Sequence, residues 1–228
     1  MITLGKVNKF QRSFGTIQTT QHLFMQYCSG EMAKTDSDQR ILFREDTSLP
    51  FDLCCMSLDI IHSFNIQSVC DMGAGFSTIL FNREKKLNVL HTVESKSTIL
   101  SRIQFYVGCF TAPHGRNVKH EFFQLQDWKE KEYKYQFVLY DLFFRRKDKP
   151  NELETAIQRT LDGGYICIND VAFENMNFFD EDAADMAKWR DEFHRLVKKH
   201  KLMKVAVSNV DRFGRYGIIF QKPYEDFG

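Results

Sequence analysis

After Asn65 the chain alternates short apolar segments typical of strands with amphipathic segments typical of helices, and this alternation constrains the fold more than any other feature. The strand-like segments FVLY and YICI are apolar at consecutive positions, which indicates burial on both faces of a sheet. Helical crossovers between such strands favour parallel pairing and right-handed connections. We therefore predict an α/β fold with a doubly wound sheet.

The end of the chain departs from this alternation. The last two strand-like segments, MKVAVSNV and RYGIIFQK, are separated only by DRFG, which is too short for a parallel crossover. They must therefore form an antiparallel hairpin. We predict a seven-stranded, mostly parallel sheet that ends in an antiparallel C-terminal hairpin strand.

The composition fits one folded domain with a less regular lead-in. The 228 residues are 43% hydrophobic and 27% charged, with four prolines, a composition that can bury a large core. Residues 1–47 are weakly periodic and carry polar clusters, so we expect an irregular or partly helical segment that caps the substrate site. Residues 48–228 are expected to form the α/β domain, beginning with a helix opened by Pro50.

Two further helix ends are predicted from single residues. Gly108 is expected to end the helix that carries Ile99 and Ile103, because glycine commonly follows a last helical turn. Leu161 continues the helical spacing of the segment opened by Pro150 and is expected to lie in that helix.

Charge and cysteine usage argue against several classes of function. The 31 basic and 30 acidic side chains give a formal net charge of +1, so no global field favours nucleic acid or a membrane as partner. No apolar run approaches the about 18 residues of a spanning helix, and MITLGKVNKFQRSF lacks a signal-peptide pattern, so we expect a cytoplasmic protein. The six cysteines include no C-x-x-C pair, as a zinc site or a redox dithiol would want.

A turn of small and polar residues, within VCDMGAGFST, follows the first strand-like segment. Gly73 and Gly75 lack a Cβ, so the backbone can contact a bound ligand, and the following helix offers free N–H donors at its start. A dinucleotide-binding turn would read G-x-G-x-x-G, but Thr78 stands at the third glycine position. The turn alone indicates a polar or anionic ligand without choosing among cofactors.

Polar side chains follow the next two strand-like segments. Glu94 ends LNVLHTVE, where a carboxylate can accept hydrogen bonds from both hydroxyls of a ribose. After VKHEFFQL come Gln126, Asp127 and Trp128; the carboxylate can accept from an adenine amino group and the aromatic ring can cover the base. Helix capping is the alternative for both acids, because each precedes a helix-like segment.

Two more strand ends bring Asp141, Asn169 and Asp170 to the same edge of the sheet, which is the binding crevice in open α/β folds. Three oxygen-bearing side chains can hold a hard cation such as Mg²⁺. The alternative is a metal-free site in which Asp141 orients a substrate or takes a proton from it, and Asp170 orders the loop that follows the strand. His22 lies in the expected cap and is the second candidate for a catalytic residue.

The order of elements and the motifs at the strand ends resemble the class I S-adenosylmethionine-dependent methyltransferases, over roughly residues 50–222. The family's first motif is an acid followed by G-x-G, which matches Asp71, Gly73 and Gly75. The resemblance implies that Asp71 attracts the cofactor's ammonium group, that Glu94 binds its ribose and that Asp127 binds its adenine. The predicted S-adenosylmethionine site then comprises Asp71, Gly73, Gly75, Phe76, Ser77, Glu94, Gln126, Asp127 and Trp128.

The acidic edge is similar to that of the catechol-type, metal-dependent O-methyltransferases, which have an acid after the fourth strand and an acid–amide pair after the fifth. In this chain the pair is reversed, with Asn169 before Asp170. The resemblance thus implies Asp141, Asn169 and Asp170 as ligands of Mg²⁺, with the reversal as a departure from the pattern. Without a metal, Asp141 or a histidine such as His22 would take the acceptor's proton.

These features predict a methyltransferase that moves a methyl group to an oxygen of a small or medium-sized molecule by in-line displacement. RNA methylation is the alternative among enzymes; the basic residues at 145–147 and Lys149 favour it and the near-zero net charge opposes it. A non-catalytic protein that holds the cofactor, or keeps only the fold, is the third hypothesis. The sequence identifies neither the acceptor nor the oligomeric state.

Overall fold

The structure is a computed structural model that describes residues 49–110, 119–142, 149–171, 183–210 and 216–224, together with Gln18 and Gln21. The strands are β1 (Ser68–Met72), β2 (Val89–Glu94), β3 (Lys119–Gln124), β4 (Tyr135–Tyr140), β5 (Thr160–Ile168), β6 (Met203–Val207) and β7 (Ile218–Gln221). The main helices are α2 (Phe51–Ser63), α3 (Phe76–Asn82), α4 (Ser97–Phe110), α5 (Leu125–Lys129), α6 (Lys149–Arg159) and α7 (Ala183–Lys199).

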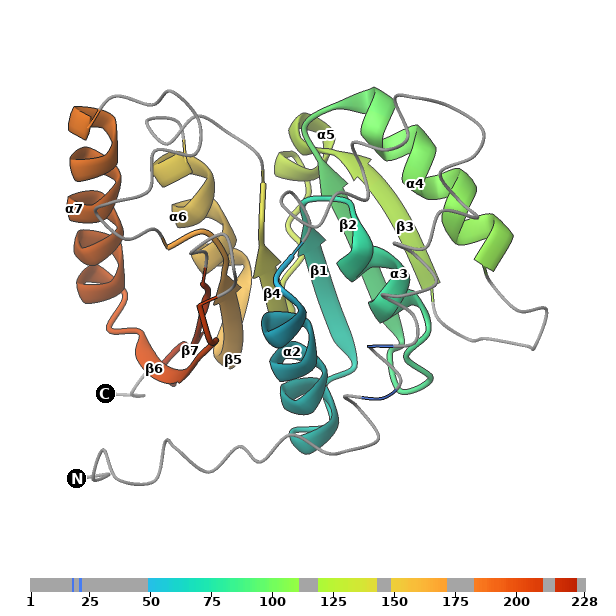
Figure 1. Cartoon of the computed structure of the whole chain (residues 1–228), viewed down its shortest axis with the longest axis horizontal. Helices are drawn as coiled ribbons and strands as arrows, with labels where there is room; N and C mark the ends of the chain where they lie inside the picture. Colours follow the sequence, from blue (N-terminus) through green and yellow to red (C-terminus); the bar gives the residue numbers. More distant parts are fainter. Residues whose placement is uncertain are drawn as a thin grey trace.

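One seven-stranded sheet runs through the molecule in the order β3-β2-β1-β4-β5-β7-β6 (Figure 1). The five strands β1 to β5 pair in parallel. β7 is antiparallel to both β5 and β6, so β6 and β7 form the predicted hairpin. The predicted doubly wound, mostly parallel sheet is confirmed.

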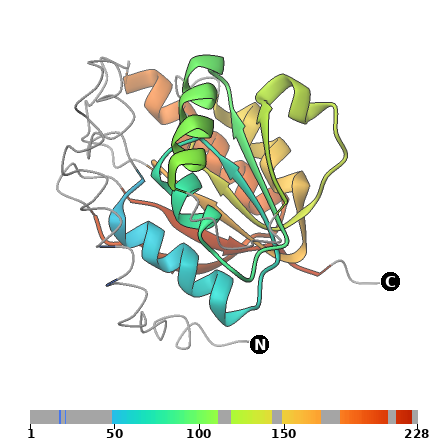
Figure 2. The same cartoon turned by 90° about the vertical axis from the view of Figure 1, so that its right-hand side faces the viewer.

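Helices cover both faces of the sheet, as Figure 1 and its turned view in Figure 2 show. Helices α2, α3 and α4 pack on one face, where Phe137 and Leu139 of β4 point. Helices α5, α6 and α7 pack on the other, where Val138 and Tyr140 point. Successive side chains of a strand point to opposite faces, so a strand in a three-layer fold is apolar at every position.

Two predicted helix ends are wrong. Helix α4 continues past Gly108 to Phe110, since a glycine inside a helix costs only about 1 kcal/mol and does not by itself end it. Leu161 lies in β5, because α6 ends at Arg159 and Thr160 already pairs with Tyr135 of β4. Helical spacing of apolar residues cannot separate a last helical turn from the first residues of a buried strand.

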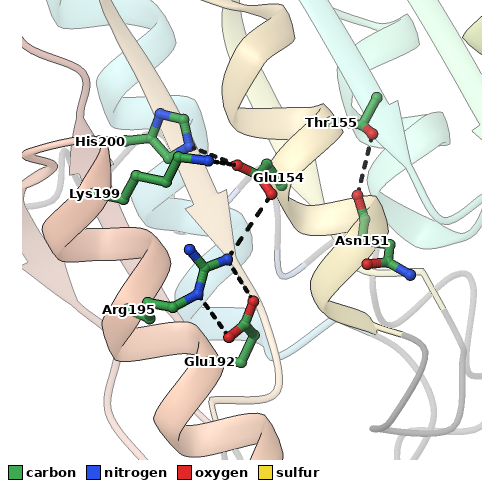
Figure 3. A network of polar contacts seen from close by, with 7 residues as sticks. All are labelled: Asn151, Glu154, Thr155, Glu192, Arg195, Lys199 and His200. Carbon is green, nitrogen blue, oxygen red and sulfur yellow. Dashed lines mark hydrogen bonds and ion pairs between the residues drawn. The ribbon is translucent and has the colours of Figure 1, made fainter.

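Ion pairs join α6 to α7 on the molecular surface (Figure 3). The Glu154 carboxylate of α6 accepts a hydrogen bond from Lys199 Nζ at 2.5 Å and lies 3.4 Å from Nε2 of His200 and 4.0 Å from Arg195. Arg195 also donates twice to Glu192 within α7. Partly exposed pairs of this kind stabilise a protein by at most about 1 kcal/mol each, so they contribute little to the stability of the contact between α6 and α7.

A relay of polar side chains is buried under α5. The Trp128 indole N–H donates to the Tyr135 hydroxyl oxygen at 2.9 Å, and the same oxygen lies 2.8 Å from Nδ1 of His91. Since an indole can only donate, the Tyr135 hydroxyl accepts from Trp128 and gives its own hydrogen to His91. Nε2 of His91 lies 3.0 Å from Glu121, and burial lowers the pKa of His91. A neutral imidazole with its hydrogen on Nε2 satisfies both neighbours.

We expect Tyr135→Phe to lower the free energy of unfolding by about 2 kcal/mol, because it leaves the indole N–H and His91 Nδ1 buried without a partner. Denaturant unfolding measures this loss. Tyr133→Phe is the matched control, since the Tyr133 ring packs edge-on against the same imidazole at 4.6 Å but is 37% exposed. Equal losses in the two variants would contradict the relay.

His120 couples the stability of the sheet edge to pH. Its Nδ1 lies 2.9 Å from the Asn82 Oδ1 and its Nε2 lies 3.0 Å from the Thr92 hydroxyl, so the neutral ring is hydrogen-bonded on both sides. Burial, followed by the nearby His91, lowers the pKa of His120 from 6.5 to about 4. Below pH 6.5 the unfolded chain binds a proton that the folded chain does not, so folding weakens as the pH falls from 6.5 to about 4.

We therefore expect His120 to contribute a loss of stability on mild acidification, which the raised pKa of the buried Asp71 opposes and which His120→Gln removes. One pH unit within this window corresponds to about 1.4 kcal/mol, so acidification from pH 6.5 to about pH 5 should cost the wild type about 2 kcal/mol more than the variant. Denaturant unfolding at both pH values gives the two slopes. Parallel slopes would show that His120 does not carry the effect.

Candidate functional site

The carboxyl ends of the parallel strands meet at one edge, and backbone hydrogen bonds extend the ladder just beyond the strands. The Gly73 N–H donates to the Val93 oxygen at 2.8 Å, and the Asp141 N–H donates to the Met72 oxygen at 2.7 Å. The Asn169 N–H donates to the Tyr140 oxygen at 3.0 Å. These bonds fix the residues that follow β1, β4 and β5 in adjacent positions, as the sequence predicted for an open α/β sheet.

The two glycines of the turn after β1 have different roles. Gly73 has a φ of +116°, and a Cβ placed on it would lie 2.4 Å from the Asp141 carbonyl oxygen. Only glycine fits that position. Gly75 has an extended φ of −172°, and apart from its chain neighbours no atom of the described part of the chain lies within 4 Å of the place a Cβ would take. Gly73 therefore serves the packing of the turn, whereas Gly75 leaves open space beside it.

The Asp71 carboxylate is enclosed by its own turn. It is completely buried and accepts hydrogen bonds from the Ser77 hydroxyl at 2.9 Å and from the Thr78 hydroxyl at 2.6 Å. Burial raises the pKa of Asp71 to about 7, against the effect of the two hydroxyls. The expected direct contact of Asp71 with a cofactor ammonium group therefore needs correction, because no part of the side chain reaches the surface.

The Glu94 carboxylate lies at the end of β2, where the sequence placed it, and binds the glycine turn. Its Oε1 accepts from the Ser95 N–H and hydroxyl and from the Lys96 N–H, at 2.7 to 3.0 Å. Its Oε2 accepts from the Ala74 N–H at 3.2 Å. Oε1 thus serves the approach to α4, as in the capping alternative, while Oε2 keeps capacity to accept a further hydrogen bond beside the turn.

Besides Asp71, three more of the predicted cofactor residues are enclosed by protein. Phe76 and Trp128 are 1% exposed and belong to the hydrophobic core, and Ser77 is 2% exposed with its hydroxyl bound to Asp71. The expectation that the Trp128 ring covers adenine is corrected by its position in the relay under α5. Gln126 and Asp127, in contrast, are exposed on α5.

The three side chains of the acidic edge are only partly joined. The Asn169 Nδ2 donates to Asp141 Oδ1 at 2.7 Å. A carboxylate can only accept, so the amide oxygen of Asn169 must point away from Asp141, and this buried oxygen has no hydrogen-bond partner among the residues that the structure describes. Asp170 has a left-handed φ of +54°, which a non-glycine residue seldom adopts outside special sites.

The donor set at this edge includes two carboxylates and one amide. Within the described parts of the chain, no group of three or more His, Cys, Asp or Glu side chains is arranged to hold a metal ion. Asp141 and Asp170 supply two carboxylates, and the third oxygen is the Asn169 amide, so the donor set fits a cation only if the amide serves as a ligand. His22 and the basic residues at 145–147 lie outside the described residues, as does the side chain of Lys149.

Thr78 is the site residue whose role the sequence analysis missed. The sequence showed only that Thr78 replaces the third glycine of a dinucleotide-binding turn. In the structure its hydroxyl oxygen accepts a hydrogen bond from the Gly75 N–H at 3.1 Å. The available signal was a hydroxyl three residues after the residue that opens a helix, which is the spacing of the capping box.

Comparison with known proteins identifies the fold. No protein-family model and no curated protein sequence matches the chain. The O-methyltransferase TomG from Streptomyces achromogenes, in complex with SAM, is 13% identical over 89% of each chain with a TM-score of 0.61. An O-methyltransferase from Bacillus cereus in complex with SAH is 14% identical over 90% of this chain and 91% of that chain, with a TM-score of 0.58.

A third solved structure is that of the N-methyltransferase NodS from Bradyrhizobium japonicum WM9, which is 10% identical over 75% of this chain and 94% of that chain, with a TM-score of 0.51. Likeness at these identities establishes architecture and no more. The protein has the class I methyltransferase fold. None of the helices that the structure describes has the length and apolarity needed to cross a membrane.

Proposed function

We propose that this protein is an S-adenosylmethionine-dependent methyltransferase that methylates an oxygen of a small or medium-sized acceptor in the cytoplasm. The observation that carries the proposal is the contact of Glu94 Oε2 with the Ala74 N–H, which places a carboxylate with spare acceptor capacity against the open glycine turn. The carboxylate can accept a hydrogen bond from a ribose hydroxyl of the cofactor. The glycine turn beside it can contact the cofactor's methionine portion, which carries both an ammonium and a carboxylate group.

The cofactor, when bound, supplies a sulfonium methyl group for in-line displacement. In the proposed arrangement Glu94 accepts a ribose hydroxyl and Gly75 admits the methionine portion, because a side chain at that position would fill the open space. Asp127 and Gln126 are exposed at the end of β3 and bind the adenine edge. Asp71 keeps the turn in place from below rather than contacting the ligand.

The acceptor lies, in this proposal, over Asp141 and Asn169. The buried Asn169 Oδ1 has no hydrogen-bond partner among the described residues, and it can accept a hydrogen bond or bind a cation. The hydroxyl group of the methyl acceptor can donate that hydrogen bond. Asp141 then takes the hydroxyl proton, while the Asn169 amide holds the carboxylate in position. If Mg²⁺ is used, Asp141, Asn169 and Asp170 would hold it and it would lower the pKa of the hydroxyl.

Isothermal titration calorimetry with S-adenosylmethionine, with and without Mg²⁺, tests the proposal. We expect saturable binding with a Kd below about 100 μM, an affinity that corresponds to about −5.5 kcal/mol. A gain in affinity for a catechol-type hydroxyl compound on addition of Mg²⁺ would favour the metal site. Absence of binding at millimolar cofactor would overturn the proposed function and would favour the hypothesis of a non-catalytic protein that keeps only the fold.

A further inference from the structure

Thr78 joins the backbone of the glycine turn to the buried Asp71 carboxylate. The Gly75 N–H donates to Thr78 Oγ1 at 3.1 Å, and the Thr78 hydroxyl donates to Asp71 Oδ2 at 2.6 Å. Thr78 is completely buried. An ionised carboxylate only accepts and a hydroxyl has a single hydrogen, so the relay runs in one direction, from backbone to hydroxyl to carboxylate.

Gly75 depends on this relay because packing does not hold it. Apart from its two neighbours in the chain, no atom of the described residues lies within 4 Å of the place a Cβ would take, so that side of Gly75 has no packing support from them. Its backbone is extended at a φ of −172°, and glycine pays the largest entropy cost for being fixed in one conformation. A hydrogen bond to its N–H from a buried, anchored hydroxyl supplies that restraint.

We propose that Thr78 is a positioning residue of the cofactor site, which holds Gly75 in its binding conformation through the relay to Asp71. The inference rests on the proposed function and deepens it. In a dinucleotide-binding turn the third position is a glycine that allows close packing of helix and strand. In this chain the same position carries a hydroxyl that sets the conformation of the second glycine.

The charge state of Asp71 provides a readout of the relay. The ionisable groups that interact with it are Glu94 from β2, Cys54 from α2, Cys70 from β1 and Cys167 from β5. Burial raises the pKa of all three thiols, which therefore stay neutral near pH 7, so Glu94 is the neighbouring charge. Burial raises the pKa of Asp71 to about 7, and the Thr78 hydroxyl opposes that rise more than the Ser77 hydroxyl does.

A cationic ligand binds better when Asp71 is ionised, so affinity should rise with pH and level off above about pH 7. Removal of the Thr78 hydroxyl takes away a donor that favours the ionised carboxylate, so the midpoint of this rise should move to higher pH.

The test compares three variants by calorimetric titration with S-adenosylmethionine from about pH 6 to pH 9. Thr78→Val should raise Kd at least tenfold at every pH and move the midpoint upward, because an isosteric side chain loses both bonds. Thr78→Ser keeps the hydroxyl and should restore Kd and midpoint. Ser77→Ala removes the other donor to Asp71 but not the bond to Gly75, so its loss should shrink at high pH while that of Thr78→Val persists.

A measurement on the wild type keeps the inference testable if Thr78→Val does not fold. The amide ¹H–¹⁵N resonance of Gly75 should titrate with a midpoint near pH 7, since its acceptor is bonded to Asp71. The inference would be overturned if the chemical shift of Gly75 did not change with pH, or if Thr78→Val bound the cofactor with wild-type affinity. In either case the proposed function would stand. A wild type that does not bind the cofactor would instead remove the proposed function.

Discussion

Gly75→Val is expected to abolish tight binding of S-adenosylmethionine and to leave the fold intact. The φ of Gly75 is one that any residue adopts, and a Cβ there meets no atom of the described residues within 4 Å beyond its chain neighbours, so we expect the folded protein to accommodate the new side chain. The same open space is where the proposed ligand meets the backbone, and the isopropyl group of valine would occupy it. We expect Kd to rise about 100-fold, which corresponds to about 2.7 kcal/mol.

Calorimetry gives the change in Kd, and thermal unfolding of the ligand-free protein verifies the fold. Gly108→Val is the matched control, because Gly108 also has no atom within 4 Å of its Cβ position but lies near the far end of α4. It should bind the cofactor as the wild type does. If Gly75→Val keeps wild-type affinity, the glycine turn is not the place where the cofactor binds.

The fold could be predicted from the sequence because its main signals are local. Consecutive apolar positions in FVLY and YICI identify strands buried on both faces, and the short distance between the last two strand-like segments predicts the hairpin. The connection is longer than the expected DRFG, because β6 ends at Val207 and β7 begins at Ile218. Strand ends then follow, so the positions of Glu94, Asp141 and Asn169 at one edge were predictable. In a parallel sheet, residues that follow the strands in the sequence lie at the same edge of the sheet.

The direction of individual side chains could not be predicted in this way. Asp71 and Trp128 stand where a cofactor contact is expected, but each points into protein and meets a partner brought by another element: the hydroxyls of α3 for Asp71 and Tyr135 of β4 for Trp128. Burial and hydrogen-bond direction arise from packing between elements. A single sequence shows that a residue ends a strand and not which way its side chain turns.

Gly73→Ala is expected to damage the fold itself. A Cβ at this position would lie 2.4 Å from the Asp141 carbonyl oxygen and 2.7 Å from its carbonyl carbon, and the φ of +116° is one that alanine rarely adopts. Neither chain can move away easily, because the Gly73 N–H is bonded to Val93 and the Asp141 N–H to Met72. Steric conflict between two fixed backbones belongs to the largest class of single-residue effects, at about 3 kcal/mol or more.

For a chain of this length such a loss lowers Tm by about 6 to 12 °C, which differential scanning calorimetry resolves. Gly75→Ala is the appropriate comparison, since it adds the same methyl group two residues away and meets no atom within 4 Å. The pair separates the two functions of one turn: Gly73→Ala should lose stability, whereas Gly75→Ala should keep it and lose affinity. Equal Tm values for the two variants would mean that β1 and β4 are not fixed against each other as closely as the contact with Asp141 requires.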